Sequence, residues 1–153
     1  MTHNQAYCST PHQLTGHLHL EQAEAGLTLV IETLAAERDP GYFFQGELRR
    51  LQGECLFLLA TRTDRENSAS AFSARLAEVE PCFRQALDIA RRQAAKSLEL
   101  RAVMSLSRLW QAQGRRDAAH TLLADVYGWF TEGFDTADLR EARVLLAALA
   151  GRP

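Results

Sequence analysis

The sequence predicts an all-α fold built from antiparallel helix pairs that pack side by side. Apolar residues recur every three or four positions through most of the chain, which is the spacing of one face of an α-helix. Glycine and short polar stretches interrupt this spacing where helices would end. Small residues stand where neighbouring helices would cross, at Gly53, Ser107 and Ala119. They would let two helix axes approach to about 8–10 Å.

Residues 100–134 show the pattern most clearly. Two apolar helical stripes are separated by Gly114 and a short polar break. The apolar and small positions of the two helices are, in chain order, Val103, Leu106, Ser107, Trp110, Ala119, Leu123 and Val126. This succession resembles a tetratricopeptide repeat (TPR), with valine at the last position in place of the usual alanine. The resemblance implies helix pairs stacked as a short right-handed superhelix.

The N-terminal part of the chain matches only one helix of a repeat pair. Residues 1–20 are polar and are expected to form a flexible tail or a weak helix, whereas residues 21–150 form the repeat domain. Residues 21–37 predict a helix that resembles the second helix of a pair, with Gly26 as its small crossing residue. Its apolar face consists of Leu27, Val30, Ile31 and Leu34. Because the segment before it is too polar to be a good first helix, we expect this face to be partly uncovered.

The next pair is predicted from residues 42–60 and 74–92. Between them, residues 61–73 are rich in Thr, Ser, Asn and Asp, which indicates a loop. Pro81 is awkward within a helix because it removes one hydrogen bond, at a cost of about 3 kcal/mol. Either the second helix of this pair begins near Glu78, with the proline in its first turn, or the helix kinks at the proline; we favour the late start.

The last helix is expected at residues 137–150, where Asp135–Thr136 is placed to cap it. A terminal helix of this kind shields the end of a stack. We expect its apolar side to consist of Leu139, Ala142, Leu146 and Leu149. Just before it, Trp129, Phe130 and Phe134 are expected to fill the junction with the central pair.

The bulk composition narrows the setting. At 153 residues the chain is one domain long, and its net charge of −2 provides no overall attraction to nucleic acid or acidic membranes. The longest apolar run, residues 55–60, is far shorter than the roughly 20 residues that cross a bilayer, and no signal peptide is evident. Cys8, Cys55 and Cys82 form neither a disulfide framework nor a zinc pattern. We expect a reduced, cytoplasmic setting.

No catalytic, cofactor or metal site is expected. His12, His17 and His19 lack a carboxylate or cysteine at ligand spacing, and His120 has no evident acid partner. The chain has no Gly-x-Ser-x-Gly, His-Glu-x-x-His or phosphate-loop motif. Two of the cysteines fall in apolar helical stripes, where an inert buried thiol is the usual case. An unrecognised enzyme is the least favoured of the functions considered.

A partner-binding face is predicted instead. In a TPR-like stack the first helices line the concave side, and on the two complete pairs this side carries Glu47, Arg50, Glu54, Phe57, Arg101, Met104, Arg108 and Gln111. Arg101, Arg108 and Arg115 recur every seven residues. Guanidinium groups pair with carboxylates in a two-pronged geometry, so the face suits a protein or an acidic peptide. The alternative is an ordinary solvated helix face.

Charge is divided unevenly along the chain. Residues 81–116 carry eight Lys or Arg against two Asp or Glu, whereas residues 1–80 carry six basic and eleven acidic residues. The two parts could pair with each other or between subunits. Arg91–Arg92 and Arg115–Arg116 could contact phosphates, but no interleaved aromatics or nucleic-acid fold signature accompany them. Nucleic acid is therefore not the favoured partner.

A more specific resemblance covers residues 21–149. It rests on the segments GELRRLQGE (residues 46–54), CFRQALDIARRQAAKSLELRA (82–102), LWQAQGRR (109–116) and YGWFTEGFDTADLREA (127–142). These resemble the C-terminal helical-repeat regions of bacterial proteins that carry class III adenylate/guanylate cyclase domains, predicted-ATPase domains, or both. The resemblance implies a non-catalytic interaction or regulatory scaffold. The alternative is a structural remnant of such a protein that self-associates, as a homodimer, through the N-terminal end of the stack.

Overall fold

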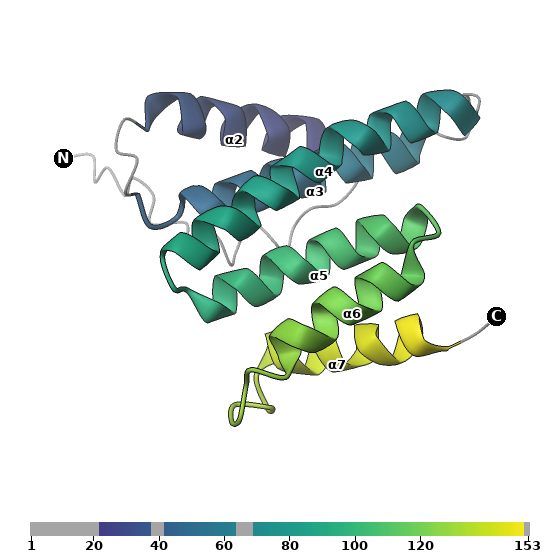
Figure 1. Ribbon diagram of the computed structural model, residues 1–153. Helices are drawn as coiled ribbons and strands as arrows, with labels where there is room; N and C mark the ends of the chain where they lie inside the picture. Colours follow the sequence, from purple (N-terminus) through teal and green to yellow (C-terminus); the bar gives the residue numbers. More distant parts are fainter. Residues whose placement is uncertain (1–21, 38–41, 64–68, 152–153) are drawn as a thin grey trace.

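The computed structural model describes residues 22–37, 42–63 and 69–151, and every regular element within them is an α-helix (Figure 1). This confirms the predicted all-α class. The expected N-terminal tail, with His12, His17, His19 and Cys8, lies outside the described residues. The helices are α2 (Ala23–Ala36), α3 (Gln45–Thr63), α4 (Ala69–Arg92), α5 (Lys96–Ala112), α6 (Arg116–Tyr127) and α7 (Ala137–Ala150).

The helices form a stack with a regular packing order. Each helix packs against the next one in the chain, and in addition α3 contacts α5 and α5 contacts α7. Among the described helices, by contrast, α2 makes no close backbone contact with α4, and α4 makes none with α6. The odd-numbered helices α3, α5 and α7 are therefore neighbours, whereas the even-numbered helices α2, α4 and α6 are held apart.

Small residues allow the close helix crossings, as predicted. A Cβ atom on Gly53 would lie only 2.5 Å from Cε1 of Phe83, whose ring is fully buried in the core. Ser107 and Ala119 are also fully buried, and the Ser107 hydroxyl donates to the Ala119 carbonyl at 3.3 Å. Each site touches a neighbouring helix at short range. A larger side chain at any of them would push the two helices apart.

Helix α4 departs from the prediction because it continues through Pro81. It begins at Ala69, so the expected start near Glu78 is wrong. Val79 and Phe83, on either side of the proline, are completely buried, whereas Pro81 itself is exposed. Burial of such side chains contributes about 1.5–3 kcal/mol each, which offsets the cost of the missing hydrogen bond. The proline ring, on the solvent side, displaces no core residue.

The connections are shorter than composition suggests. Helix α3 extends to Thr63 and α4 starts at Ala69, so most of the loop expected at residues 61–73 is helical. The turn between α5 and α6 agrees with the prediction, since Gly114 has a φ angle of +78° and a side chain would be strained there. Thr136 holds the N-cap position of α7, although its side chain makes no capping hydrogen bond.

The junction between α6 and α7 is less buried than predicted. Of the three aromatics predicted to fill the α6–α7 junction, only Phe130 packs against the core. Trp129 and Phe134 are 58% and 42% exposed, and the Lys96 ammonium lies 5.4 Å from the Trp129 ring centre. Leu145, rather than the expected Leu146, is the buried leucine at that turn of α7.

Candidate functional site

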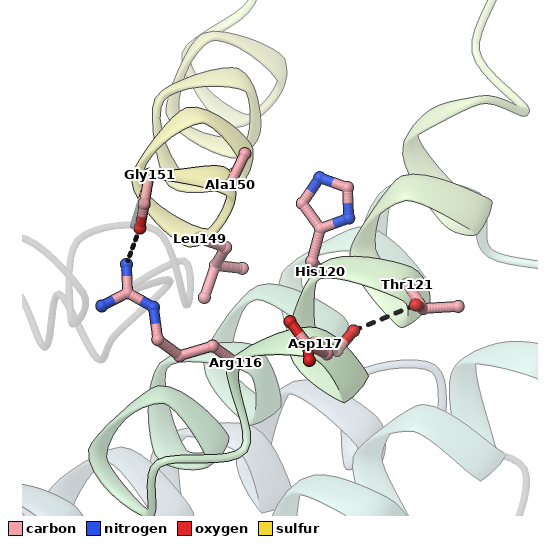
Figure 2. Close-up of a pocket in the computed structure, with 7 residues that line it drawn as sticks. All are labelled: Arg116, Asp117, His120, Thr121, Leu149, Ala150 and Gly151. Atoms are coloured by element: carbon pink, nitrogen blue, oxygen red, sulfur yellow. Dashed lines mark hydrogen bonds between the residues drawn. The ribbon is translucent and has the colours of Figure 1, made fainter. Parts of the chain in front are cut away.

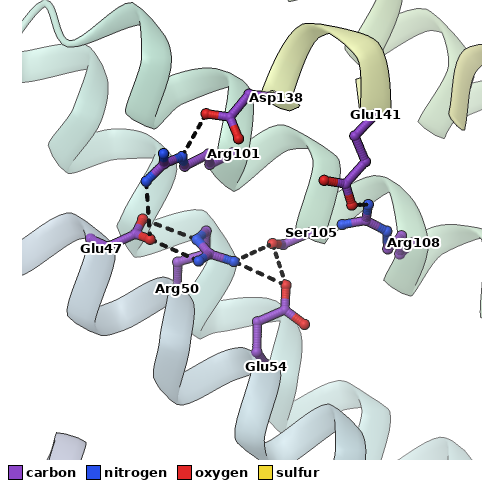
Figure 3. A network of polar contacts seen from close by, with 8 residues as sticks. All are labelled: Glu47, Arg50, Glu54, Arg101, Ser105, Arg108, Asp138 and Glu141. Atoms are coloured by element: carbon purple, nitrogen blue, oxygen red, sulfur yellow. Dashed lines mark hydrogen bonds and ion pairs between the residues drawn. The ribbon is translucent and has the colours of Figure 1, made fainter. Parts of the chain in front are cut away.

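The odd-numbered helices share one polar face, which carries a network of charged side chains (Figure 3). We call this set the odd-helix network. Its contacts join three helices that are far apart in the sequence, so the network depends on how the helices stack. Its members are Glu47, Arg50 and Glu54 on α3, Arg101, Ser105 and Arg108 on α5, and Asp138 and Glu141 on α7.

Arg50 is the hub between α3 and α5. Its Nε and Nη2 atoms donate to the two carboxylate oxygens of Glu47 at 3.0 and 2.7 Å. Its Nη1 atom donates to Glu54 Oε1 at 3.2 Å and to Ser105 Oγ at 3.3 Å. The Ser105 hydroxyl in turn donates to Glu54 Oε1 at 2.6 Å. This small ring of contacts fixes the register of α3 against α5.

Burial makes these contacts matter for stability. The side chains of Arg50 and Glu47 are only 8% and 2% exposed. Burial alone would lower the pKa of Arg50, but the hydrogen bond and charge of Glu47, together with the charges of Glu54 and Asp138, raise it above its ordinary value. The guanidinium therefore stays charged. Removing one member of such a buried pair leaves the other charge without compensation.

Arg101 and Arg108 connect α5 to α7. Arg101 Nε donates to Asp138 Oδ2 at 2.8 Å, and its Nη1 atom lies 3.6 Å from Glu47 Oε1. Arg101 thus bridges carboxylates from both neighbouring odd-numbered helices. About two helical turns further along α5, Arg108 forms an ion pair with Glu141 that is much more open to solvent, with side-chain exposures of 34% and 56%. The side chains of the network are buried at Arg50 and become more exposed to solvent towards Arg108.

The predicted partner-binding face therefore coincides with this network, but it differs from the expected row of open arginines. Glu47, Arg50 and Met104 are buried. Phe57 and Gln111 are half-buried. The arginines already have carboxylate partners within the chain, so the face is not an ordinary solvated one either. Sequence reasoning missed Ser105, Asp138 and Glu141; the signal available was the spacing of Asp138 and Glu141, one turn apart on the last helix.

Arg115, third in the seven-residue series of arginines, lies in a different cluster. Its Nη1 atom donates to Glu80 Oε2 at 3.3 Å, and its guanidinium carbon lies 4.3 Å from the Trp110 ring centre. Trp110 Nε1 and Arg84 Nη2 donate to the other oxygen of Glu80 at 3.1 and 2.7 Å. Burial would raise the pKa of Glu80, but the hydrogen bonds from Arg84 and Trp110 and the nearby positive charges lower it. This cluster ties α4 to α5.

Arg91 and Arg116, also considered as phosphate contacts, have partners within the chain. Arg91 Nε donates to Glu99 Oε1 at 2.9 Å. Arg116 donates to the carbonyls of Ala148 and Gly151 at the C-terminal end of α7. Those carbonyls have no partner within their own helix, so the guanidinium closes the end of α7.

A surface depression lies beside this helix end, with a volume of about 380 Å³ (Figure 2). Besides Arg116 it is lined by Asp117, His120 and Thr121 from α6 and by Leu149, Ala150 and Gly151 from α7. Figure 2 shows the imidazole of His120 directed away from the Arg116 guanidinium. The Thr121 hydroxyl donates to the Asp117 main-chain carbonyl at 3.0 Å. The polar side chains thus do not converge on a common point.

The two cysteines within the described residues are structural. Cys55 is buried, and burial followed by the charge of Glu54 raises the pKa of its thiol to about 11. Cys82 is half-buried, and burial raises its thiol pKa as well. Both thiols are therefore mainly protonated near pH 7, when they are poor nucleophiles.

No group of three or more His, Cys, Asp or Glu side chains in the described part of the chain is arranged to hold a metal ion. None of the described helices is both long and apolar enough to cross a membrane. Comparisons of the chain with protein-family models, with curated proteins and with solved structures found no match.

Proposed function

We propose that this chain is a non-catalytic helical-repeat module that binds another protein through the odd-helix face. The observation that carries the proposal is the packing order, in which α3, α5 and α7 contact one another while the even-numbered helices stay apart. In such a stack the helices that touch lie on the inside of a curve and those held apart lie on the outside. Solenoids of helix pairs use the inner surface of this curve for binding.

The proposed arrangement is a short right-handed superhelix of the tetratricopeptide kind, with α3–α4 and α5–α6 as its complete pairs. Two features support it beyond the packing order. Gly53 and Ser107 stand one on each first helix at the close crossing, and Ala119 faces Ser107 from the second helix of its pair. These are the small positions of the repeat pattern. The superhelix also accounts for a polar inner face whose charged residues come from different pairs.

The proposed ligand is an acidic segment of a partner protein, which would bind by exchange of carboxylates. Arg101 and Arg108 are held by Asp138 and Glu141. A carboxylate on the partner could replace either acid without leaving a guanidinium unpaired. The cost of releasing the Arg108–Glu141 pair is small, because exposed ion pairs contribute only about 0.2–1 kcal/mol. The Arg108 end of the face is therefore the natural entry point.

We further propose that the module serves cyclase or ATPase signalling proteins in a cytoplasmic, reducing setting. The support is the resemblance of residues 21–149 to the C-terminal repeat regions of such bacterial proteins, and the free thiols of Cys55 and Cys82. In those proteins the catalytic sites lie in other domains. The role proposed for this chain is accordingly to bind or regulate, and not to catalyse.

A capture experiment with three variants tests the proposal. Immobilised wild-type chain and Arg108→Glu are compared for the proteins they retain, with Arg92→Glu as the control because it makes the same charge change on the outer helix α4. We expect one partner to be retained by the wild type and the control but reduced at least about tenfold on Arg108→Glu. Glu141→Gln frees Arg108 and should raise affinity up to about fivefold. Equal retention by all four proteins would reject the odd-helix face as the binding surface.

A further inference from the structure

The outer surface of α2 combines exposed apolar side chains with negative charge. Leu29 and Ile31 are 50% and 46% exposed, although α2 lies at one edge of the stack and packs only on α3 among the described helices. Glu24 and Glu32 are exposed between them, and residues 23–36 include no Lys or Arg. Neither glutamate side chain has an ion-pair partner within the described residues. A helix that is apolar over most of its circumference usually has neighbours on more than one side.

The outer surface of α7, at the opposite end of the stack, has the complementary character. Val144 is 67% exposed and is followed by the exposed alanines Ala147 and Ala148. Arg140 and Arg143 are exposed on the same side of the helix. The two acidic residues of α7 are already paired with arginines of α5, but no carboxylate in the described part of the chain pairs with Arg140 or Arg143. This surface is therefore apolar and basic.

The first and last described helices have fewer neighbours than the helices between them. Within the stack, α4 lies between α3 and α5, and α6 lies between α5 and α7, so an even-numbered helix normally contacts two odd-numbered ones. Among the described helices, α2 contacts only one odd-numbered helix, α3. Likewise α3 and α5 each contact two even-numbered helices, whereas α7 contacts only one even-numbered helix, α6, besides its contact with α5. Within the described part of the chain, α2 therefore has one odd-numbered neighbour fewer than α4 and α6, and α7 has one even-numbered neighbour fewer than α3 and α5.

We propose that α2 of one copy packs against α7 of a second copy, so that the chain self-associates head to tail. The contact would complete the packing order at both ends, since α2 would gain an odd-numbered neighbour and α7 an even-numbered one. It would cover part of the exposed surface between Leu29 and Ile31 with Val144 and the adjoining alanines, whose small side chains permit close approach. Glu24 and Glu32 would face Arg140 and Arg143. Exposed apolar patches next to matching charges are typical of protein interfaces.

The geometry predicts growth beyond a dimer. The two surfaces differ, so the contact is heterologous, and each added copy presents one new α2 and one new α7. Assemblies of this type form open chains unless the rotation between copies closes a ring. Because the charges lie at the surface, association should weaken at high ionic strength, where the screening length falls from about 10 Å at 0.1 M to about 3 Å at 1 M salt.

Sedimentation velocity of the full chain, measured over a series of concentrations, tests the proposal. The wild type is compared with two variants in which the charges of one end are reversed. The first variant, Glu24→Arg/Glu32→Arg, has two basic ends, and the second, Arg140→Glu/Arg143→Glu, has two acidic ends. We expect the wild type to grow past a dimer with concentration, and each variant alone to need at least about tenfold more protein for half-association. Mixing the two variants in equal amounts should restore growth, because every contact is again between opposite charges.

Control variants distinguish a loss of the α2–α7 contact from a general effect of changing surface charge or of unfolding. Arg92→Glu, on α4, should associate as the wild type does, and circular dichroism confirms that each variant is folded. Val144→Arg provides a second block at the α7 end that uses a single exposed position. A wild type that stays monomeric at all concentrations, with α2 covered by another part of its own chain, overturns the proposal. An Arg140→Glu/Arg143→Glu variant that dimerises at the same concentration as the wild type also overturns it, because that result would indicate an α2-to-α2 contact.

Discussion

Replacing Gly53 by alanine is the most informative change to the core. Alanine is the better helix former, by about 1 kcal/mol, so helix propensity alone predicts a more stable protein. The structure predicts the opposite. The added Cβ atom would stand 2.5, 2.7 and 3.1 Å from three ring carbons of Phe83. Phe83 has no exposed surface, so its ring has no solvent side to move into.

The size of the effect follows from these distances. Carbon atoms pack at about 3.5–4.0 Å, so the ring or the helix must move by about 1 Å. Overpacking of a filled core typically costs about 1–3 kcal/mol, and a clash this short belongs near the upper end. After the gain in helix propensity, Gly53→Ala should destabilise the fold by about 1–2 kcal/mol. For a chain of this length, that lowers the melting temperature by roughly 2–8 °C.

Urea denaturation followed by circular dichroism measures this difference. A double-mutant cycle with Phe83→Leu supplies the control, because leucine removes the ring that the new Cβ atom would strike. We expect the double variant to be less destabilised than the sum of the two single changes, by about 1 kcal/mol or more. If Gly53→Ala is more stable than the wild type, or if the two changes are additive, the α3–α4 crossing is not as close as described.

Three further changes address the polar contacts. Arg50→Ala should cost about 3 kcal/mol in urea denaturation, because the buried Glu47 carboxylate loses both short hydrogen bonds and keeps only the Arg101 guanidinium, 3.6 Å away. Arg84→Ala, whose side chain is 54% exposed, should cost about 1 kcal/mol or less; equal costs would show that burial does not strengthen the Arg50 contacts. Burial would raise the pKa of Glu99, but the salt bridges from Lys96 and Arg91 outweigh it and lower that pKa in the folded protein. These salt bridges therefore add their full contribution to the free energy of unfolding at a pH above the pKa of Glu99 in the unfolded chain. The contribution is lost as the pH falls through the lower pKa of the folded protein. The free energy of unfolding of Glu99→Gln should therefore fall less between pH 6 and pH 3 than that of the wild type. An equal fall in both proteins would show that these salt bridges do not stabilise the fold. Arg116→Ala should speed amide hydrogen exchange at the end of α7 alone, because the terminal carbonyls lose their donor; protection lost throughout the fold would argue for a wider role.

Residue spacing was sufficient to predict that the chain is helical, the bounds of some helices and the positions of their closest crossings. The bounds of α7 and the turn at Gly114 agree with the sequence pattern. So do the buried positions of Gly53, Ser107 and Ala119. These features are local: a helix face follows from periodicity, and a small residue within an apolar stripe indicates close contact whatever its partner is.

The course of α4 could not be derived from local rules. Pro81 and the polar stretch before it both indicate a helix boundary. The deciding factor is that Leu76 and Val79, which precede the proline, are buried in the core. Tertiary burial of this kind overrides local propensity. The aromatic cluster shows the reverse case, since Trp129 and Phe134 have strong apolar character and yet remain largely exposed.

The sequence predicts where the arginines lie on α5, but not that they form ion pairs with carboxylates of the same chain. The seven-residue spacing correctly places Arg101 and Arg108 on one side of α5. Their partners Asp138 and Glu141 stand 37 and 33 residues away on another helix. Only the packing of α7 against α5 brings these carboxylates within reach. A sequence pattern reveals a charged face, but whether the charges are already paired depends on the tertiary structure.

The central claim is that α5 lies between α3 and α7, with its polar face paired on both sides. Nuclear Overhauser spectra of the isotope-labelled chain test this most directly. We expect cross-peaks between side-chain hydrogens of Ser105 and Glu54 and between those of Arg101 and Asp138, because the hydrogen-bonded oxygen and nitrogen atoms at the tips of these side chains lie 2.6 and 2.8 Å apart. If Arg101 and Ser105 instead show contacts only within α5, the odd-numbered helices are not neighbours, and the proposed binding face is wrong.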